Sequence, residues 1–167
     1  LLQGYSPTQI VVLTPYLGQL SQITRLMRRE LQNVDAYISE KDLDEFEGED
    51  HDELAGAKAI IAGNNVRCSS VDNYQGEESD IVIASLVRCN KYGSIGFLKE
   101  PQRVNVLLSR ARLGMFIVGS YKTLLKSSGG KKTWSGLYEM MTERGQIKRG
   151  FPTVCQIHPD DPPAELC

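Results

Sequence analysis

The sequence of 167 residues contains few cysteines, few aromatic residues and no long apolar run. The four cysteines are scattered, so buried thiols in a reducing, cytoplasmic compartment are expected for Cys68 and Cys89 in place of a disulfide framework. No apolar run approaches the roughly 18 residues of a membrane-spanning helix, so no membrane span is expected. Since no initiator methionine precedes Leu1, the chain is expected to be a piece of a longer protein.

Motifs of self-sufficient nucleotide and metal sites are also missing from the sequence. Residues 128–133, Ser-Gly-Gly-Lys-Lys-Thr, lack the G-x-x-x-x-G-K-[ST] spacing of a P-loop and follow a predicted helix instead of a strand. There is no H-E-x-x-H pair, EF-hand loop or nucleophile elbow. The chain alone is therefore expected to lack the means of holding Mg²⁺ and ATP.

Negative charge is concentrated in one short segment. Residues 40–53 contain nine acidic residues and one lysine, a net charge of −8, whereas the whole chain carries −2 and the remainder therefore +6. The segment predicts a solvated or disordered surface loop inserted at about 39–56, in preference to a mimic of nucleic acid. The mildly basic remainder suits a nucleotide or nucleic-acid binder, but this charge is also common in proteins that bind neither.

Apolar strands alternate with amphipathic helices along the chain. Unbroken apolar runs predict buried strands at residues 9–13, 34–38, 66–71, 81–87 and 115–118. Helical spacing predicts helices at 18–31, 101–110, 121–126 and from about 134 to 145, with a loop at 127–132. This alternation predicts an α/β fold with a parallel sheet flanked by helices over residues 1–148, followed by an irregular, proline-rich tail at 149–167.

Polar turns follow three of the predicted strands. Because ligands gather at the carboxyl ends of parallel strands, the turns at 14–16, 72–80 and 88–100 are expected to converge on one edge. Arg110 and Arg112 lie where a helix passes into a strand, and the arginine fork suits phosphate. The carboxylates of 72–80 can accept hydrogen bonds from ribose hydroxyls, whereas a two-metal nuclease site lacks a distant carboxylate or histidine.

Two stretches carry a resemblance to a known family. VDNYQGEESDIVIASLVRCN and GFLKEPQRVNVLLSRARLGMFIVG resemble motifs V and VI of superfamily 1 helicases, most closely the Upf1-like branch of RNA helicases. VVLTPYLGQLSQI resembles the strand and turn that precede these motifs, and the resemblance covers residues 9–145. It implies the second of two RecA-like domains, with ATP in the cleft between them. The P-loop, the Mg²⁺-holding carboxylates and a Gln-Tyr-Arg-x-His segment would then belong to chain before Leu1.

The resemblance also implies roles for individual residues. Arg110 would be the arginine finger that reaches the γ-phosphate, with Arg112 either supporting it or forming a surface ion pair. Glu78 would lie near the ribose of the nucleotide. Gln75 and Gly76 would form the turn that links the nucleotide to the nucleic-acid groove. Single-stranded RNA would contact Thr14, Pro15, Tyr16, Asp72, Arg88 and Asn90, with Asp72 also holding its own turn.

The function that follows is the carboxyl-terminal half of an ATP-dependent RNA helicase, inactive as an isolated chain. The alternatives are a non-catalytic RNA- or protein-binding module of the same fold and a superfamily 1 DNA helicase, although retention of the two arginines favours hydrolysis. In the tail, Cys155 and His158 stand in a C-x-x-H-P sequence. This resembles the start of the NFX-type zinc-finger array that some helicases of this branch carry, and implies zinc there; an incidental tail is the alternative.

Overall fold

The computed structural model describes residues 4–31, 35–47, 54, 65–148, 151–153 and 164–166. The chain divides into two compact units, Leu1–Thr133 and Trp134–Cys167. Within the described ranges, every helix is too short or too polar to cross a lipid bilayer.

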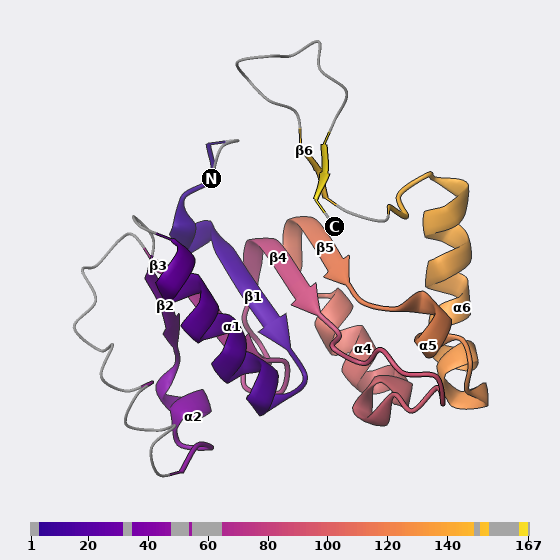
Figure 1. Cartoon of the computed structure of the whole chain (residues 1–167), viewed down its shortest axis with the longest axis horizontal. Coiled ribbons are helices and arrows are strands. Elements are labelled where there is room, and N and C mark those ends of the chain that lie inside the picture. The colour runs from indigo at the N-terminus through magenta and orange to yellow at the C-terminus, as the bar shows by residue number, and fades with distance from the viewer. Residues whose placement is uncertain are drawn as a thin grey trace. The chain divides into compact units, whose positions relative to one another are not determined.

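A five-stranded, all-parallel sheet forms the first unit (Figure 1). Its strands are β1 (Ile10–Thr14), β2 (Asp35–Ile38), β3 (Asn65–Ser70), β4 (Ser79–Ser85) and β5 (Ala111–Val118), in the order β2-β3-β1-β4-β5. β1 is an unbroken apolar run because it lies at the centre of the sheet, and its last four residues are buried. The predicted α/β fold with a parallel sheet is thus confirmed.

Helices and short turns connect the strands. They are η1 (Pro7–Gln9), α1 (Leu17–Glu30), α2 (Glu40–Leu43), η3 (Gly96–Lys99), α4 (Pro101–Leu108), α5 (Tyr121–Leu124) and α6 (Ser128–Glu143). α1 packs on β1, β2 and β3, and crosses in front of them in Figure 1. The crossovers from β1 to β2 and from β4 to β5 run in opposite directions, so a common right hand puts α1 and α4 on opposite faces.

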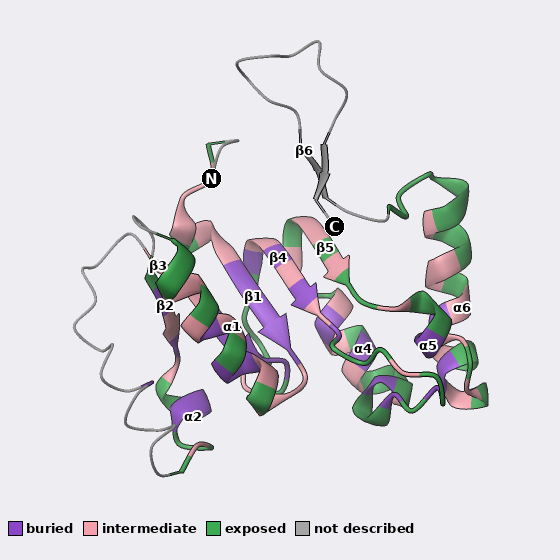
Figure 2. Cartoon of the chain, viewed as in Figure 1, coloured by how far each residue is buried: buried purple, intermediate pink, exposed green. Residues whose placement is uncertain are grey.

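The core beneath α1 consists of small and branched apolar side chains. Leu20 of α1 and Val66 of β3 are almost fully buried there, together with Cys68. Figure 2 shows most of β1 as buried. Burial raises the pKa of the Cys68 thiol to about 12, so this side chain is a neutral apolar group at physiological pH. The expectation of a buried thiol is confirmed for Cys68 and wrong for Cys89, which is exposed because it lies beyond the end of β4.

The acidic segment does not begin as a solvated loop. The Ser39 hydroxyl accepts a hydrogen bond from the Asp42 amide and so caps α2, in which Asp42 and Leu43 are buried. Leu54, from the same segment, is 2% exposed and belongs to the core. The prediction of a surface insertion is therefore wrong at these positions, because apolar residues and one carboxylate find buried partners; residues 48–53 and 55–64 lie outside the described ranges.

Two predicted boundaries also shift. β5 begins at Ala111, and none of its eight residues is buried, since it is the last strand on its side of the sheet (Figure 2). α6 begins at Ser128, where a loop was expected, because the Ser127 hydroxyl accepts a hydrogen bond from the Gly130 amide. A Cβ on Gly130 would lie 2.0 Å from the Leu124 carbonyl oxygen, so this turn can approach α5 only with glycine.

The tail contains regular structure where an irregular chain was expected. β6 (Phe151–Thr153) and β7 (Ala164–Leu166) pair antiparallel in a separate two-stranded sheet. Prolines argued against strands in this region, but only Pro152 lies within one. Both strands of a two-stranded sheet are edges, where proline is tolerated.

Candidate functional site

The structure separates the predicted site residues into two groups at opposite ends of the sheet. The group at the carboxyl ends of β1, β3 and β4 comprises Thr14, Pro15, Tyr16, Asp72 and Arg88. The group at the amino ends of β4 and β5 comprises Glu78, Arg110 and Arg112. The three turns that were expected to converge do begin together at the carboxyl ends of β1, β3 and β4, but residues 71–78 lead from there to the amino end of the parallel strand β4, so Glu78 lies with the two arginines at the other end.

Arg110 lies in the turn between α4 and β5, and its fork is occupied by acceptors of this chain. Its Nε donates to the Val106 carbonyl oxygen at 2.7 Å and its Nη1 to the Glu77 carbonyl oxygen at 2.9 Å. Its Nη2 donates to the Ser109 hydroxyl at 2.7 Å. All three acceptors are neutral, whereas hydrogen bonds to an anion are roughly twice as strong. A phosphate group at this position would therefore compete well for the fork.

Arg112, the second residue of β5, is held by one exposed and one half-buried carboxylate. Its Nε lies 3.3 Å from Glu78 Oε2, and its Nη1 lies 3.8 Å from Asp80 Oδ1. The side chains of Arg112 and Glu78 are 58% and 53% exposed. An exposed ion pair of this kind contributes about 0–1 kcal/mol, so both groups can change partner at little cost. Gln9 Nε2 donates to the other Asp80 oxygen at 2.8 Å and ties η1 to this cluster.

The loop at 71–78 presents Gln75 and Gly76 to solvent. Gly76 has a φ of +87°, a left-handed conformation that other residues adopt only with strain. Beneath the loop Tyr74 is buried, and burial is the main cause that raises the pKa of its hydroxyl. The Arg67 guanidinium carbon lies 4.8 Å from the Tyr74 ring centroid, and Arg67 Nη1 pairs with Glu77 Oε2 at 2.5 Å. The loop is thus fastened to β3 on one side.

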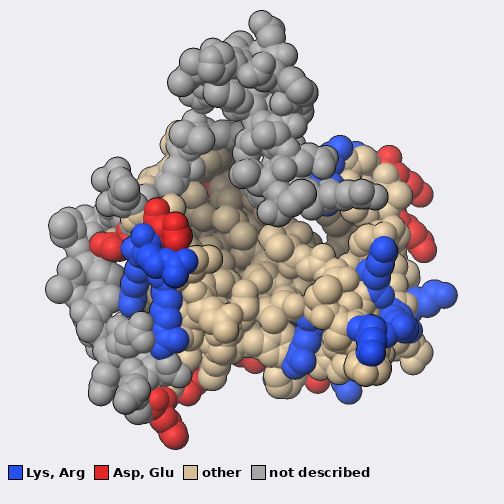
Figure 3. All heavy atoms as spheres, in the orientation of Figure 1, with Lys and Arg blue, Asp and Glu red and all other residues tan. Residues whose placement is uncertain are grey.

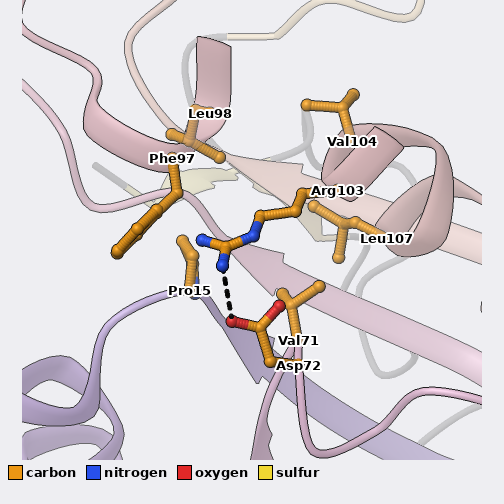
Figure 4. Close-up of a pocket in the computed structure, with 8 residues that line it drawn as sticks. All are labelled: Pro15, Val71, Asp72, Phe97, Leu98, Arg103, Val104 and Leu107. Carbon is orange, nitrogen blue, oxygen red and sulfur yellow. Dashed lines mark ion pairs between the residues drawn. The ribbon is translucent and has the colours of Figure 1, made fainter. Parts of the chain in front are cut away.

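Arginine–aromatic contacts characterise the carboxyl end of the sheet. The Arg88 guanidinium carbon lies 4.5 Å from the centroid of the Tyr16 ring, and the Tyr16 hydroxyl donates to the Ile95 carbonyl oxygen at 3.1 Å. The Arg103 guanidinium carbon lies 4.2 Å from the Phe97 ring centroid, and Arg103 Nη2 lies 3.6 Å from Asp72 Oδ2 (Figure 4). The sequence analysis missed Phe97 and Arg103, because no periodic pattern marks a contact between η3 and α4.

A strained residue positions Arg88. Val87, the second residue after β4, has a φ of +63°, and the Arg88 amide donates to the Leu86 carbonyl oxygen at 2.6 Å. A branched residue held in this region costs about 1–3 kcal/mol, and such strain is concentrated at functional sites. The tight turn redirects the chain as it leaves the sheet, immediately before the arginine that lies over Tyr16.

Two other predicted contact residues are used by the fold itself. Thr14 is fully buried, and its hydroxyl has no hydrogen-bond partner in the part of the chain that the structure describes. Asn90 Oδ1 accepts from the amides of Tyr92 and Ser94, and Asn90 Nδ2 donates to the Ser94 carbonyl oxygen at 2.8 Å. The Asn90 side chain therefore closes its own loop.

Asp42 is a buried carboxylate at the carboxyl end that the sequence analysis did not single out. Its Oδ2 accepts from the hydroxyls of Ser39 at 2.8 Å and Ser69 at 2.5 Å. Its Oδ1 accepts from the Ser70 amide at 3.0 Å and Asn73 Nδ2 at 2.9 Å. Burial raises the pKa of Asp42, but these donors lower it more, to below the usual 3.8. The ionised carboxylate therefore ties α2, β3 and the loop at 71–78 together.

The described residues contain no cluster of three or more His, Cys, Asp or Glu side chains that could hold a metal ion. The predicted zinc ligands Cys155 and His158 lie outside the described ranges.

Comparison with known proteins gives a consistent set of relatives. The family model described as "AAA domain" matches residues 1–122. NFX1-type zinc finger-containing protein 1 of Mus musculus is 35% identical over 160 residues, which are 96% of this chain and 6% of that protein. A regulator of nonsense transcripts 1 homolog of Arabidopsis thaliana is 36% identical over 150 residues, 90% of this chain and 10% of that protein.

A yeast protein extends this set. ATP-dependent helicase NAM7 of Saccharomyces cerevisiae is 32% identical over 148 residues, which are 88% of this chain and 12% of that protein. The chain thus spans between 6% and 12% of the length of these three relatives.

Proposed function

Because the chain belongs to the AAA domain family and is related over most of its length to Upf1-like superfamily 1 helicases, we propose that it is the second RecA-like domain of an ATP-dependent RNA helicase. In this role it supplies an arginine finger and part of the groove for the single strand. The phosphate cradle and the Mg²⁺ ligands come from a first RecA-like domain of the same protein, since this sequence has no P-loop.

The observation that carries the proposal is the arrangement of Arg110, Arg112 and Glu78 at one end of the sheet. Arg110 bonds only neutral acceptors, and Arg112 and Glu78 form an exposed pair. Two exchangeable guanidinium groups beside a carboxylate are a donor and acceptor set that fits a nucleotide: the forks suit phosphate oxygens and the carboxylate suits ribose hydroxyls.

Arg110 acts on the reaction through its charge. When the cleft closes, its fork exchanges the Val106 and Glu77 carbonyls for oxygens of the γ-phosphoryl group and stabilises the charge that develops as the phosphoryl group is transferred to water. Arg112 keeps the surrounding field positive and orients Glu78. Release of the products allows Arg110 to return to its carbonyl partners, and the cleft opens.

In this proposal the carboxyl end of the sheet binds the single-stranded RNA. Arg88 and Tyr16 are both accessible there and contact each other, whereas the Thr14 side chain is buried and contributes only through its backbone. A grip of this kind on phosphates tolerates any sequence and weakens with salt. RNA in preference to DNA rests on the relatives alone, because no described contact is specific for a 2′-hydroxyl.

Replacement of Arg110 tests the proposal directly. In the complete protein, Arg110→Ala is expected to lower the ATP turnover rate by about 10³-fold or more, as loss of an arginine finger does. ATP binding, measured by equilibrium dialysis, should change little, because the other domain holds most of the nucleotide. Arg29→Ala is the matched control, since Arg29 is an exposed arginine on α1, far along the chain from the cluster.

Two outcomes would contradict the proposal. Unchanged turnover in Arg110→Ala would remove the finger assignment. Metal-dependent ATP hydrolysis by the 167-residue chain alone would show that it does not depend on a second domain for its phosphate cradle. Parallel assays with single-stranded RNA and DNA of one sequence would decide between an RNA and a DNA helicase.

A further inference from the structure

A pocket beside η3 and α4 adjoins the turn that is proposed to contact the single strand (Figure 4). Val71, Leu98 and Leu107 form part of its apolar lining, and Pro15 and Phe97 approach it from the β1 turn and from η3. Arg103 and Asp72, which lie 3.6 Å apart, are the charged residues of the lining. The lining thus combines apolar surface, one aromatic ring and one guanidinium group.

Two neighbouring side chains contact the Phe97 ring but leave much of it exposed to solvent. Arg103 lies over it at 4.2 Å, and the Tyr16 ring centroid is 6.2 Å away with the two planes inclined by 34°. Phe97 is nevertheless 45% exposed. A large apolar side chain in this state is held in place by neighbours while much of its surface remains open, so a second planar group can stack on it without first immobilising the ring.

The charge around the pocket favours an anionic occupant. Residues 88–103 and 122–132 together contain eight Lys and Arg residues, and the acids near the pocket are Glu100 and the lining residue Asp72. Figure 3 shows Lys and Arg side chains gathered near α5 and the first turn of α6, with few acidic atoms among them. Single-stranded nucleic acid combines a polyanionic backbone with planar bases, which meets both the charge and the exposed ring. An acidic peptide would meet the charge alone.

We propose that a nucleobase of the single strand stacks on the exposed part of the Phe97 ring, at the rim of this pocket. The proposal rests on the proposed function, because the strand already lies at the neighbouring turn of Pro15 and Tyr16. Arg103 remains over Phe97 and Asp72 and adds positive charge beside the phosphate that follows the bound base. The carboxyl end of the sheet would then bind the nucleic acid through a base as well as through its phosphates.

The test compares a strand with bases and a strand without them. Binding of the complete protein to a short oligouridine and to an abasic strand of equal length is measured by fluorescence anisotropy. Phe97→Ala should weaken oligouridine binding by about 5- to 150-fold, the effect of losing one base stack, and leave binding of the abasic strand unchanged. Phe97→Tyr should bind both strands as the unsubstituted protein does.

Phe116→Ala is the matched control, because Phe116 is the same residue type with 42% exposure on β5 and is expected to bind both strands normally. Equal binding by Phe97→Ala and the unsubstituted protein would overturn the pocket assignment and leave the proposed function intact. Equal losses on both strands would also overturn it, since Phe97 would then act only through the fold. No binding of either strand by the unsubstituted protein would overturn both proposals.

A second measurement needs no variant. Photocrosslinking of the unsubstituted protein with an oligonucleotide that carries 5-iodouracil should give an adduct on the peptide that contains Phe97. Adducts confined to peptides outside residues 14–16 and 95–103 would overturn the assignment.

Discussion

The two ends of the parallel sheet hold their charged groups in opposite ways. At the amino end, Arg112 and Glu78 are more than half exposed, and Arg110 is bonded to neutral oxygens. At the carboxyl end, Asp42 is fully buried among four donors, and Arg88 lies over the ring of Tyr16.

This difference indicates which end of the sheet can exchange its hydrogen-bond and ion-pair partners. An exposed ion pair is weak and is exchanged readily, whereas removal of one partner from a buried, hydrogen-bonded charge is costly. The amino end is therefore suited to a ligand that binds and leaves, as a nucleotide does. The carboxyl end is suited to a surface whose shape is retained through the cycle.

Removal of the buried carboxylate is expected to have the largest effect. Asp42→Ala leaves the donors of Ser69, Ser70 and Asn73 without their acceptor and should lower the free energy of unfolding by about 3 kcal/mol. Urea denaturation provides the measurement. Asp44→Ala is the control, because Asp44 is exposed on the same segment and should change stability by less than about 0.5 kcal/mol. Similar losses in both variants would remove the contrast between buried and exposed charge.

The aromatic contacts at the same end are expected to have a smaller effect. Tyr16→Phe removes the hydrogen bond to Ile95 but keeps the ring under Arg88, and should cost about 1 kcal/mol. Tyr16→Leu removes both and should cost about 2 kcal/mol. Thermal unfolding of the two variants measures the difference. Equal stability of both would show that the Arg88 contact contributes nothing.

Acid should weaken the carboxyl end in a way that depends on Asp42. The pKa of Asp42 in the folded chain lies below its usual 3.8, so the stabilisation is complete above that value and is lost as the pH falls through the folded pKa. Protonation removes the charge but not the side chain, so this loss should be smaller than that in Asp42→Ala. The free energies of unfolding of the unsubstituted chain and of Asp42→Ala should therefore approach each other in acid. A difference between them that stays constant from pH 7 to pH 2 would contradict this role of Asp42.

The smallest effect is expected at the amino end. Glu78→Gln breaks the exposed pair with Arg112 and should change the free energy of unfolding by less than about 1 kcal/mol, with a difference that shrinks in high salt. In the complete protein, the proposed contact between Glu78 and the ribose predicts that the same substitution raises the KM for ATP. A large loss of stability would mean that the two ends do not differ.

The sequence correctly predicted that strands alternate with helices, but not which strands lie at the centre of the sheet and which at its edge. The apolar run at 81–87 correctly predicted β4, which lies between two strands. The similar run at 115–118 predicted a buried strand, yet β5 is at an edge. A single run of apolar residues records that a strand forms, but not how many neighbours it has, because that depends on crossovers of distant segments.

The two ends of the site were hard to predict for the same reason. Asp42 is one of nine acidic residues in its segment, and the donor of Ser69 that makes it special lies 27 residues away. Arg88 follows β4 and Arg110 precedes β5. They lie at opposite ends of the sheet because these two strands are parallel, so the connection between them must return to the other end. Motif resemblance grouped these residues by role, whereas the sheet separates them in space.

The loop at 71–78 has a mechanical consequence. Asn73 is fixed to Asp42 at one end of the sheet, and the Glu77 carbonyl is fixed to Arg110 at the other. Between these two points the chain is folded into turns, in which the Gln75 amide donates to the Asp72 carbonyl oxygen and the Glu77 amide to the Tyr74 carbonyl oxygen. In the proposed function, exchange of the Glu77 carbonyl for a phosphate oxygen would release the loop at the nucleotide end while Asp42 still holds it at the other end. The two events proposed for the two ends of the sheet would then be coupled through this one loop.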